Sequence, residues 1–251
     1  MAIGQSNKPD YGVDAPNVLR NLFLIGTACL LFGIFGPRKI HLGQVDFLPR
    51  PMLFGTGSLL LLEALLFLFY VRVGKYHHRD RMLSLRKWRG DEQVLDVGCG
   101  RGLLLAGAAK LLADGGKTTG IDIWSNVDMG GNSEAATLHN LELEGISDRC
   151  ALGIPAQEMP FPDASFDVIL SNLCLHNIYD RETRRRALDQ IVRVLKPGGQ
   201  AILSDYKLTG EYAAQLQTAG LLVLRRWGNP LYTFPPLRIV VARKPLGEQV
   251  G

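Results

Sequence analysis

The residues with the clearest chemical potential lie in the stretch VLDVGCGRG, residues 94–102. Its glycines, Gly98, Gly100 and Gly102, permit positive φ and let a ligand approach the backbone closely. A dinucleotide fingerprint has the spacing G-x-G-x-x-G, but here the third glycine comes one residue early. Asp96, just before the loop, would also repel a pyrophosphate. The loop therefore favours a ligand that carries positive charge.

A second acid stands where a nucleoside ligand would need it. Asp122, in the stretch TTGIDIW, ends the next expected strand, where a carboxylate suits ribose hydroxyls. Asp96 suits ammonium and sulfonium groups. Together these are the groups of S-adenosylmethionine.

With these motifs the sequence resembles the class I S-adenosylmethionine-dependent methyltransferases over roughly residues 76–244. Two further stretches match in order: MPFPDASFDVILSN (159–172) resembles the family's turn into its fourth strand, and RVLKPGGQAILSD (193–205) the entry to its fifth. The resemblance implies S-adenosylmethionine as cofactor and methyl transfer as activity. The cofactor-binding residues that it implies are Asp96, Gly98, Cys99, Gly100, Gly102, Asp122, Ile123, Trp124, Ala156, Gln157 and Asn172.

The adenine end of the cofactor site departs from the family pattern. Pro155 stands where many relatives carry an acid that accepts from the adenine amino group. The resemblance then leaves that contact to the amide of Ala156 and the side chain of Gln157. It places Ile123 and Trp124 against the adenine ring.

The candidate catalytic residues follow the fourth expected strand in SNLCLHNIYD, residues 171–180. Methyl transfer needs in-line positioning of a nucleophile, and a base is needed only if the acceptor must lose a proton. We select His176, because imidazole titrates near neutrality, and Tyr179. The alternative is that His176 is an ordinary structural histidine in an apolar run.

The same segment is typical of the small-molecule branch, which includes quinone-ring, sterol and phospholipid-headgroup methyltransferases. The N/D-P-P-Y/F signature common in nucleic-acid methyltransferases is replaced here by SNLC, residues 171–174. We therefore expect a small-molecule or lipid acceptor and no nucleic-acid partner. His77 and His78 are adjacent and point apart on a helix, so no metal site is expected.

From residue 91 onward, short β-branched runs alternate with helical stretches. This pattern predicts an α/β fold, a Rossmann-like seven-stranded, mostly parallel sheet with helices on both faces, preceded by two transmembrane helices. The expected strands are 93–97, 118–123, 149–153, 166–172, 200–206, 221–227 and 237–242. The expected helices are 102–113, 133–144, 181–195 and 210–219, the third ended by a turn at 197–199.

Two apolar runs in the first third predict a membrane hairpin, with helices at about residues 17–36 and 51–73. A bilayer core about 30 Å thick needs about 20 helical residues. A signal peptide fits poorly, because Pro37, Arg38 and Lys39 follow the first run where a cleavage site would stand. A buried helix of a soluble core is the other alternative.

The net charge of +4 is concentrated in residues 72–90, which hold seven basic side chains and one acid. Because basic residues favour the cytoplasmic side, we expect a membrane protein whose catalytic domain is cytoplasmic. The expected division is a hairpin (1–75) that anchors without helping the rest to fold, a basic linker and lid helix (76–90), a methyltransferase domain (91–245) and a tail (246–251).

Composition excludes several other classes of protein. Hydrophobic residues make up 47% and charged residues 21%, so the chain is not disordered, and its four cysteines form no disulfide or zinc framework. Two other functions remain open: a membrane module that binds S-adenosylmethionine without catalysis, and a soluble enzyme whose apolar helices form a lid or a dimer interface. The oligomeric state is not set by the sequence.

Overall fold

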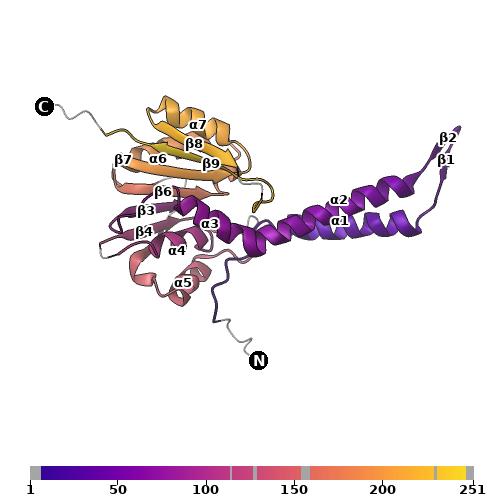
Figure 1. Ribbon diagram of the computed structural model, residues 1–251, viewed down its shortest axis with the longest axis horizontal. Coiled ribbons are helices and arrows are strands. Elements are labelled where there is room, and N and C mark those ends of the chain that lie inside the picture. Colours follow the sequence, from indigo (N-terminus) through magenta and orange to yellow (C-terminus); the bar gives the residue numbers. More distant parts are fainter. Residues whose placement is uncertain (1–6, 114, 127–128, 154–158, 229–230, 247–251) are drawn as a thin grey trace.

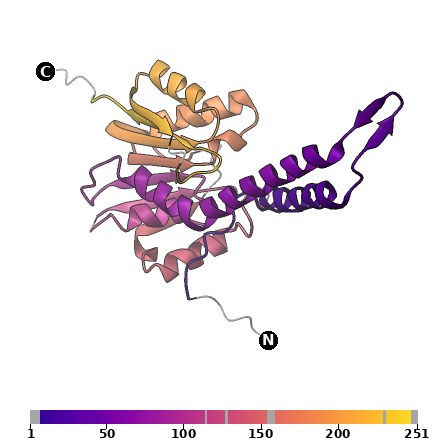
Figure 2. The ribbon, with the colours of Figure 1, turned by 45° about the vertical axis from the view of Figure 1, so that its right-hand side comes forward.

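A computed structural model describes residues 7–113, 115–126, 129–153, 159–228 and 231–246. It shows an α/β domain from which a helical hairpin projects, and both views agree on this arrangement (Figure 1, Figure 2). The chain enters the hairpin first and returns from it into the domain, so both ends of the hairpin meet the same edge of the domain.

The sheet of the domain is built as the sequence predicts. Its strands are β3 (Gln93–Val97), β4 (Lys117–Ile121), β5 (Cys150–Gly153), β6 (Phe166–Asn172), β7 (Leu195–Asp205), β8 (Leu222–Gly228) and β9 (Arg238–Arg243). They form a seven-stranded sheet in the order β5-β4-β3-β6-β7-β9-β8 among the described residues. Strands β3 to β7 pair in parallel, whereas β9 runs antiparallel to β7 and β8. The predicted α/β fold with a seven-stranded, mostly parallel sheet is therefore confirmed.

Helices cover both faces of the sheet. They are α3 (Lys75–Leu83), α4 (Leu103–Ala109), α5 (Glu134–Leu143), α6 (Arg181–Val194) and α7 (Thr209–Thr218), with short 3-10 turns η2 (Ser147–Arg149) and η3 (Leu175–Asn177). Side chains alternate along a strand, so Leu95 packs in the core under α6 and α7, whereas its neighbour Val94 packs with α3 and α4. Ser133 and Asp180 cap α5 and α6 by accepting from backbone amides of the first turn.

One expected turn is different in the structure. Helix α6 ends at Val194, and residues 195–199 form an irregular first part of β7 instead of a separate turn. The register with β6 shifts there, between Phe166 and Val168, and Gly198 has φ +77°. The Pro-Gly-Gly sequence therefore bends the strand without ending it.

The hairpin consists of α1 (Pro16–Phe35) and α2 (Pro49–Phe69), joined at its tip by the strand pair β1 (Ile40–Leu42) and β2 (Val45–Phe47). Glycines let the two helices touch: a Cβ on Gly57 would lie 2.5 Å from the backbone nitrogen of Leu30. Such close contact at small residues is typical of helix pairs in membranes. Both helices are long and apolar enough to cross a bilayer, and only 11% and 17% of their apolar windows are buried.

The predicted boundary after residue 75 stays a prediction. Helix α2 continues through a π-helical segment, η1 (Tyr70–Gly74), directly into α3, so residue 75 lies inside an unbroken helix. The predicted linker and lid helix, residues 76–90, is helical as far as Leu83. Its Met82 is fully buried against the sheet and lines the large cavity described below. A continuous helix therefore joins the hairpin to the domain.

The segment before α1 also packs on the domain. Tyr11 is 3% exposed, and its hydroxyl donates a hydrogen bond to Oε1 of Glu144 at 2.6 Å. The buried Lys75 Nζ donates to the carbonyls of Tyr11 and Gly12 at 2.9 and 2.6 Å. We call residues 8–15 the N-terminal strap. We call the ends of the hairpin next to the domain, residues 16–23 and 64–74, the hairpin root. The strap and the hairpin root thus belong to the same packed unit as the sheet.

A shortened chain that begins at Tyr76 is therefore expected to unfold, contrary to the sequence-based expectation. It loses Tyr11, Phe67, Tyr70 and Val71, all at most 6% exposed. Burial of four such side chains stabilises by roughly 6–12 kcal/mol, which is comparable with the whole stability of a typical domain. Thermal unfolding followed by circular dichroism measures this. A matched control replaces residues 24–63 with a short Gly-Ser linker and keeps the strap and root. Cooperative unfolding of the Tyr76 chain at the full-length temperature would contradict the prediction.

Candidate active site

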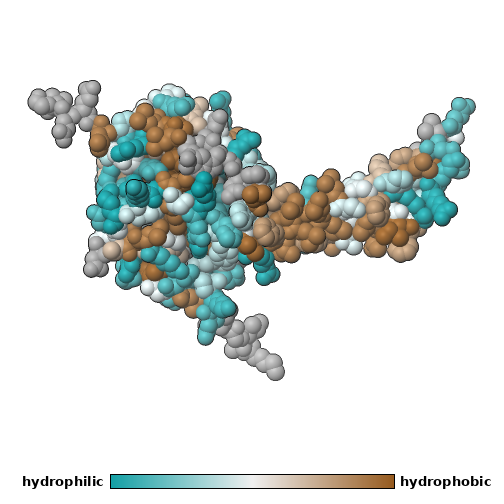
Figure 3. All heavy atoms as spheres, in the orientation of Figure 1, coloured by the Kyte–Doolittle hydropathy of each residue, from teal (hydrophilic) through white to brown (hydrophobic). Residues whose placement is uncertain are grey.

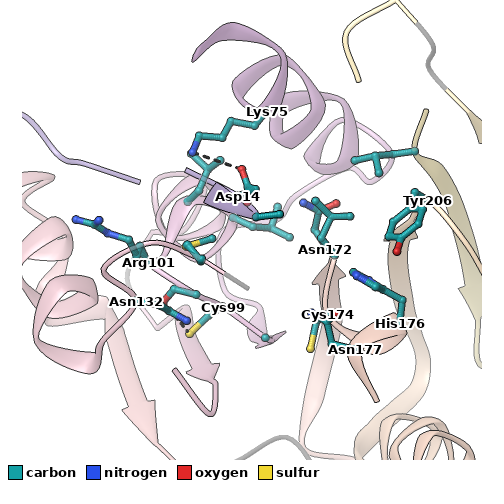
Figure 4. Close-up of a pocket in the computed structure, with 18 of the residues that line it drawn as sticks. Asp14, Lys75, Cys99, Arg101, Asn132, Asn172, Cys174, His176, Asn177 and Tyr206 are labelled. Atoms are coloured by element: carbon teal, nitrogen blue, oxygen red, sulfur yellow. Dashed lines mark hydrogen bonds and ion pairs between the residues drawn. The ribbon is translucent and has the colours of Figure 1, made fainter. Parts of the chain in front are cut away.

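A cavity of about 630 Å³ opens at the carboxyl edge of the parallel strands. This edge is where ligands bind in open α/β sheets. Residues at the ends of β3, β4 and β6 line it, namely Asp96, Asp122 and Asn172, together with Tyr206 just after β7. The opposite wall comes from the strap and the hairpin root, and Figure 4 shows Asp14 and Lys75 there, across from His176 and Cys174. The site is thus shared between the two parts of the chain.

The glycine loop has the conformation that its sequence requires. Gly98, Gly100 and Gly102 have φ of +76°, +53° and +85°, where side chains are strained. A Cβ on Gly98 would lie 2.2 Å from Sγ of Cys174, so no other residue fits there. The loop thereby leaves its backbone open to the cavity, next to the side chain of Cys99.

Asp122 is held in a fixed orientation at the end of β4. The amide of Gly100 donates to its Oδ2 at 2.8 Å, and the amide of Trp124 donates to its Oδ1. Asp122 is 9% exposed and lines the cavity, beside the 61% exposed Ile123. Nδ2 of Asn132 also approaches Oδ1 at 3.5 Å. A carboxylate accepts about four hydrogen bonds in all, so one ribose hydroxyl can bind at Oδ2 and a second can take the place of the long Asn132 contact.

Asp96 is a buried acid without a cation. It is 1% exposed, and its Oδ2 has no hydrogen-bond partner among the described residues. Burial, reinforced by the neighbouring Asp122 carboxylate, raises the pKa of Asp96 to about 8. A buried carboxylate that lacks a partner is costly, and a ligand that brings an ammonium group would remove that cost. The residues present therefore fit the methionine end of S-adenosylmethionine.

Binding of S-adenosylmethionine is expected to tighten as the pH rises to 8. The cationic ligand binds the ionised form of Asp96, and because the pKa of this group in the free protein is about 8, binding below that pH releases a proton. Affinity should fall by up to about tenfold for each pH unit below 8. Calorimetry at pH 6, 7 and 8, in two buffers of different ionisation enthalpy, measures both effects. Asp96→Asn should remove the pH dependence, and a constant affinity in the wild-type protein would contradict the assignment.

The other predicted cofactor residues fall into three groups. Cys99 and Asn172 line the cavity. Trp124 is in the left-handed region, with φ +49°, and its indole Nε1 donates to Oγ1 of Thr137 at 3.3 Å, toward α5. Ala156 and Gln157 lie outside the described residues, so their predicted adenine contacts stay predictions.

His176 lies in the turn η3 with an acidic partner. Its Nδ1 is 2.8 Å from Oδ1 of Asp205, which is 1% exposed, and its amide donates to Oδ2 of the same residue at 3.2 Å. The ring of Tyr206 packs edge-on at a centroid distance of 4.7 Å. With Nδ1 turned to Asp205, Nε2 is the nitrogen that is left for a ligand. Tyr179 is 84% exposed and can contact a ligand only at the mouth of the cavity.

Several residues of the site were not predicted. Asp205 could have been predicted from the sequence. It ends the parallel strand of the motif 193–205, and the carboxyl ends of parallel strands form the edge at which ligands bind. Asn132, 5% exposed with an unpartnered Oδ1, and Asp14 lie in segments with no motif. Only tertiary packing brings them to the cavity.

Comparisons with known proteins agree with this geometry. Residues 95–203 match the family model described as "Methyltransferase domain". A sterol 4-C-methyltransferase of Caenorhabditis elegans is 37% identical over 47% of this chain and 32% of its own length. A ubiquinone/menaquinone biosynthesis C-methyltransferase of Vibrio campbellii is 31% identical over 47% of this chain and 42% of its own length. A SAM-dependent methyltransferase structure from Aquifex aeolicus superimposes with a TM-score of 0.53 at 20% identity, covering 66% of this chain and 88% of that one.

The α/β domain is therefore a class I S-adenosylmethionine-dependent methyltransferase domain, and S-adenosylmethionine is its cofactor. The chain spans less than half the length of the two curated relatives described above. The similarity to both relatives covers about half of this chain.

Proposed function

We propose that the protein is a membrane-anchored enzyme that transfers the methyl group of S-adenosylmethionine to a small lipophilic acceptor. One observation carries the proposal: the cavity that holds the cofactor residues is closed on its other side by the root of the apolar hairpin. Val18, Phe67 and Tyr70 come from that root, and Asp96 and Asp122 from the sheet. An acceptor in this cavity would contact both the hairpin root and the part of the sheet that holds the cofactor residues.

The surface of the hairpin supports the membrane part of the proposal. Apolar residues cover its length and polar residues gather at its tip (Figure 3). Large side chains such as Leu24, Phe35, Leu59 and Leu65 are 56–77% exposed. A core helix of a soluble protein would be mostly buried, and a contiguous exposed apolar surface of this extent needs a membrane or a partner to cover it. The length of both helices favours a bilayer.

The basic run, residues 72–90, leaves fewer unpaired charges for anionic lipid than its seven basic side chains suggest. Lys75 is buried beside Asp14, and Arg79, Arg86 and Arg89 pair with acids of the chain at 2.8–3.3 Å. Arg72, at the hairpin root, stays exposed. The hairpin, more than the basic run, would hold the domain at a cytoplasmic membrane face.

The chemistry available to the acceptor comes from His176 and Asp205. When bound, S-adenosylmethionine would supply an electrophilic methyl group and, with its S–CH3 bond broken, would leave as S-adenosylhomocysteine. Nε2 of His176 can take the proton of an acceptor hydroxyl or of an acidic carbon as the new bond to the methyl carbon forms. The imidazolium produced faces the Asp205 carboxylate, whose negative charge stabilises it.

The class of acceptor is proposed from the cavity and the relatives together. Beside Asp14 and Lys75, the hairpin side of the cavity carries the apolar side chains Val18, Phe67, Phe234 and Leu237. The two relatives are named for sterol methylation and for quinone biosynthesis. A lipophilic molecule with a polar group at its reacting end suits this cavity.

The test is incubation of the full-length protein with labelled S-adenosylmethionine and a native membrane extract. Label is expected in the organic-solvent phase, in a species that mass spectrometry identifies as methylated. His176→Gln serves as the matched control and should leave this species unlabelled. Cofactor binding with no transfer to any fraction would instead indicate a non-catalytic binding module, and label confined to the aqueous phase would contradict a lipophilic acceptor.

A further inference from the structure

The joint between the hairpin and the domain is a π-helical segment. Residues Tyr70–Gly74 form η1 between α2 and α3, and a Cβ on Gly74 would lie 1.8 Å from the carbonyl oxygen of Tyr232. In a π-helical segment the side chains point in directions different from those in a regular α-helix, and such segments are frequent at functional sites. Here Tyr70 is 2% exposed and lines the cavity. The end of the membrane helix is thus inserted into the wall of the active site.

Tyr70 has an apolar and a polar side. Its ring stacks on Phe67 at a centroid distance of 6.3 Å and packs with Leu237. Tyr70 also belongs to the same buried cluster as Leu173, the residue that follows Asn172 at the end of β6. Tyr70 therefore packs in the apolar root and also lines the cavity that holds Asn172.

Two buried oxygen atoms of residues that line the same cavity lack a hydrogen-bond donor among the described residues. Oδ1 of Asn172 has no hydrogen-bond partner among the described residues, nor has Oδ2 of Asp14 apart from its 3.8 Å ion pair with Lys75. Both residues line the cavity, and Figure 4 shows Asp14 beside Lys75 and Asn172 between Asp14 and Tyr206. Buried polar atoms are normally satisfied, so a ligand hydroxyl at this position would supply the missing hydrogen bond.

We infer that Tyr70 is an acceptor-binding residue, so that the membrane anchor supplies part of the active site. This rests on the proposed function and narrows its substrate class. The acceptor would carry two oxygens on its polar head, one at His176 and one between Tyr70 and Asn172. Its apolar remainder would lie against Val18, Phe67 and Phe234, toward the hairpin.

The experiment compares three proteins: Tyr70→Phe, Tyr76→Phe and wild type. It measures the rate of label transfer to a lipid extract of native membranes as the amount of extract is varied. Both variants remove one hydroxyl from the same helix. Tyr76 packs edge-on against Tyr11 and is not among the residues that line the cavity. Tyr70→Phe should lower kcat/KM for the extract by about tenfold, the usual scale of one lost hydrogen bond. Tyr76→Phe should stay within twofold of wild type.

A purely structural role of Tyr70 has a different signature. Calorimetry with S-adenosylhomocysteine and thermal unfolding should give wild-type values for Tyr70→Phe, because its ring and packing are retained. Equal kcat/KM for Tyr70→Phe and wild type would overturn the inference and leave the proposed function standing. Absence of label transfer by the wild-type protein would overturn both.

Discussion

Replacing His176 with Gln should lower kcat by about 10²–10⁴, the usual contribution of a positioned general base. The side chain is 11% exposed, borders the cavity and has its Nδ1 2.8 Å from the buried Asp205. Glutamine keeps much of the volume but cannot take a proton. The measurement is the single-turnover rate of label transfer at saturating cofactor.

Two further variants separate chemistry from folding. His139→Gln alters a histidine on the surface of α5 whose side chain is 44% exposed, and it should leave the rate unchanged. Asp205→Asn keeps the shape of the side chain but removes the charge that faces the imidazolium. The rate of label transfer by this variant should therefore also fall below that of the wild type. A His176→Gln rate within threefold of wild type would show that proximity alone suffices and that no base is used.

Asp122→Ala should weaken binding of S-adenosylmethionine and of S-adenosylhomocysteine by about 10²–10⁴. Two hydrogen bonds from ribose to a charged acceptor would be lost, each worth about 1.5–3 kcal/mol. The substitution also removes the acceptor of the hydrogen bonds that the amides of Gly100 and Trp124 donate to Asp122. Calorimetry on the detergent-solubilised protein gives the affinities.

The matched control is Asp148→Ala, which removes an acid with a 74% exposed side chain outside the cavity. Asp122→Asn should be intermediate, because one oxygen can still accept. Unchanged affinity in Asp122→Ala would remove this residue from the cofactor site and would contradict the resemblance on which its role was predicted.

The sheet and the cofactor half of the site could be predicted because their signals are local. The glycine loop, Asp96 and Asp122 each stand at a fixed distance from an apolar strand, and the fold places all strand ends on one edge. The alternation of Val94 and Leu95 likewise sets which face each side chain covers. Such patterns need no knowledge of distant contacts.

The acceptor half could not be predicted, because contacts between residues far apart in the sequence create it. Lys75 looked like one charge of a solvated basic run, yet it is buried and binds the carbonyls of Tyr11 and Gly12. Tyr70 looked like an ordinary apolar residue near the end of the predicted span 51–73. The π turn that directs it into the cavity has no sequence signature, and so the hairpin was predicted to be a separable anchor.

The measurement that tests the central claim most directly uses vesicles. Full-length protein is reconstituted into phosphatidylcholine/phosphatidylglycerol vesicles, and the lipid extract that accepts label is placed either in the same vesicles or in separate ones. If the acceptor enters the cavity from the surrounding bilayer, transfer should be at least about tenfold faster in the same-vesicle arrangement. Equal initial rates in the two arrangements would mean that the acceptor arrives through water, and would contradict an active site supplied from the membrane.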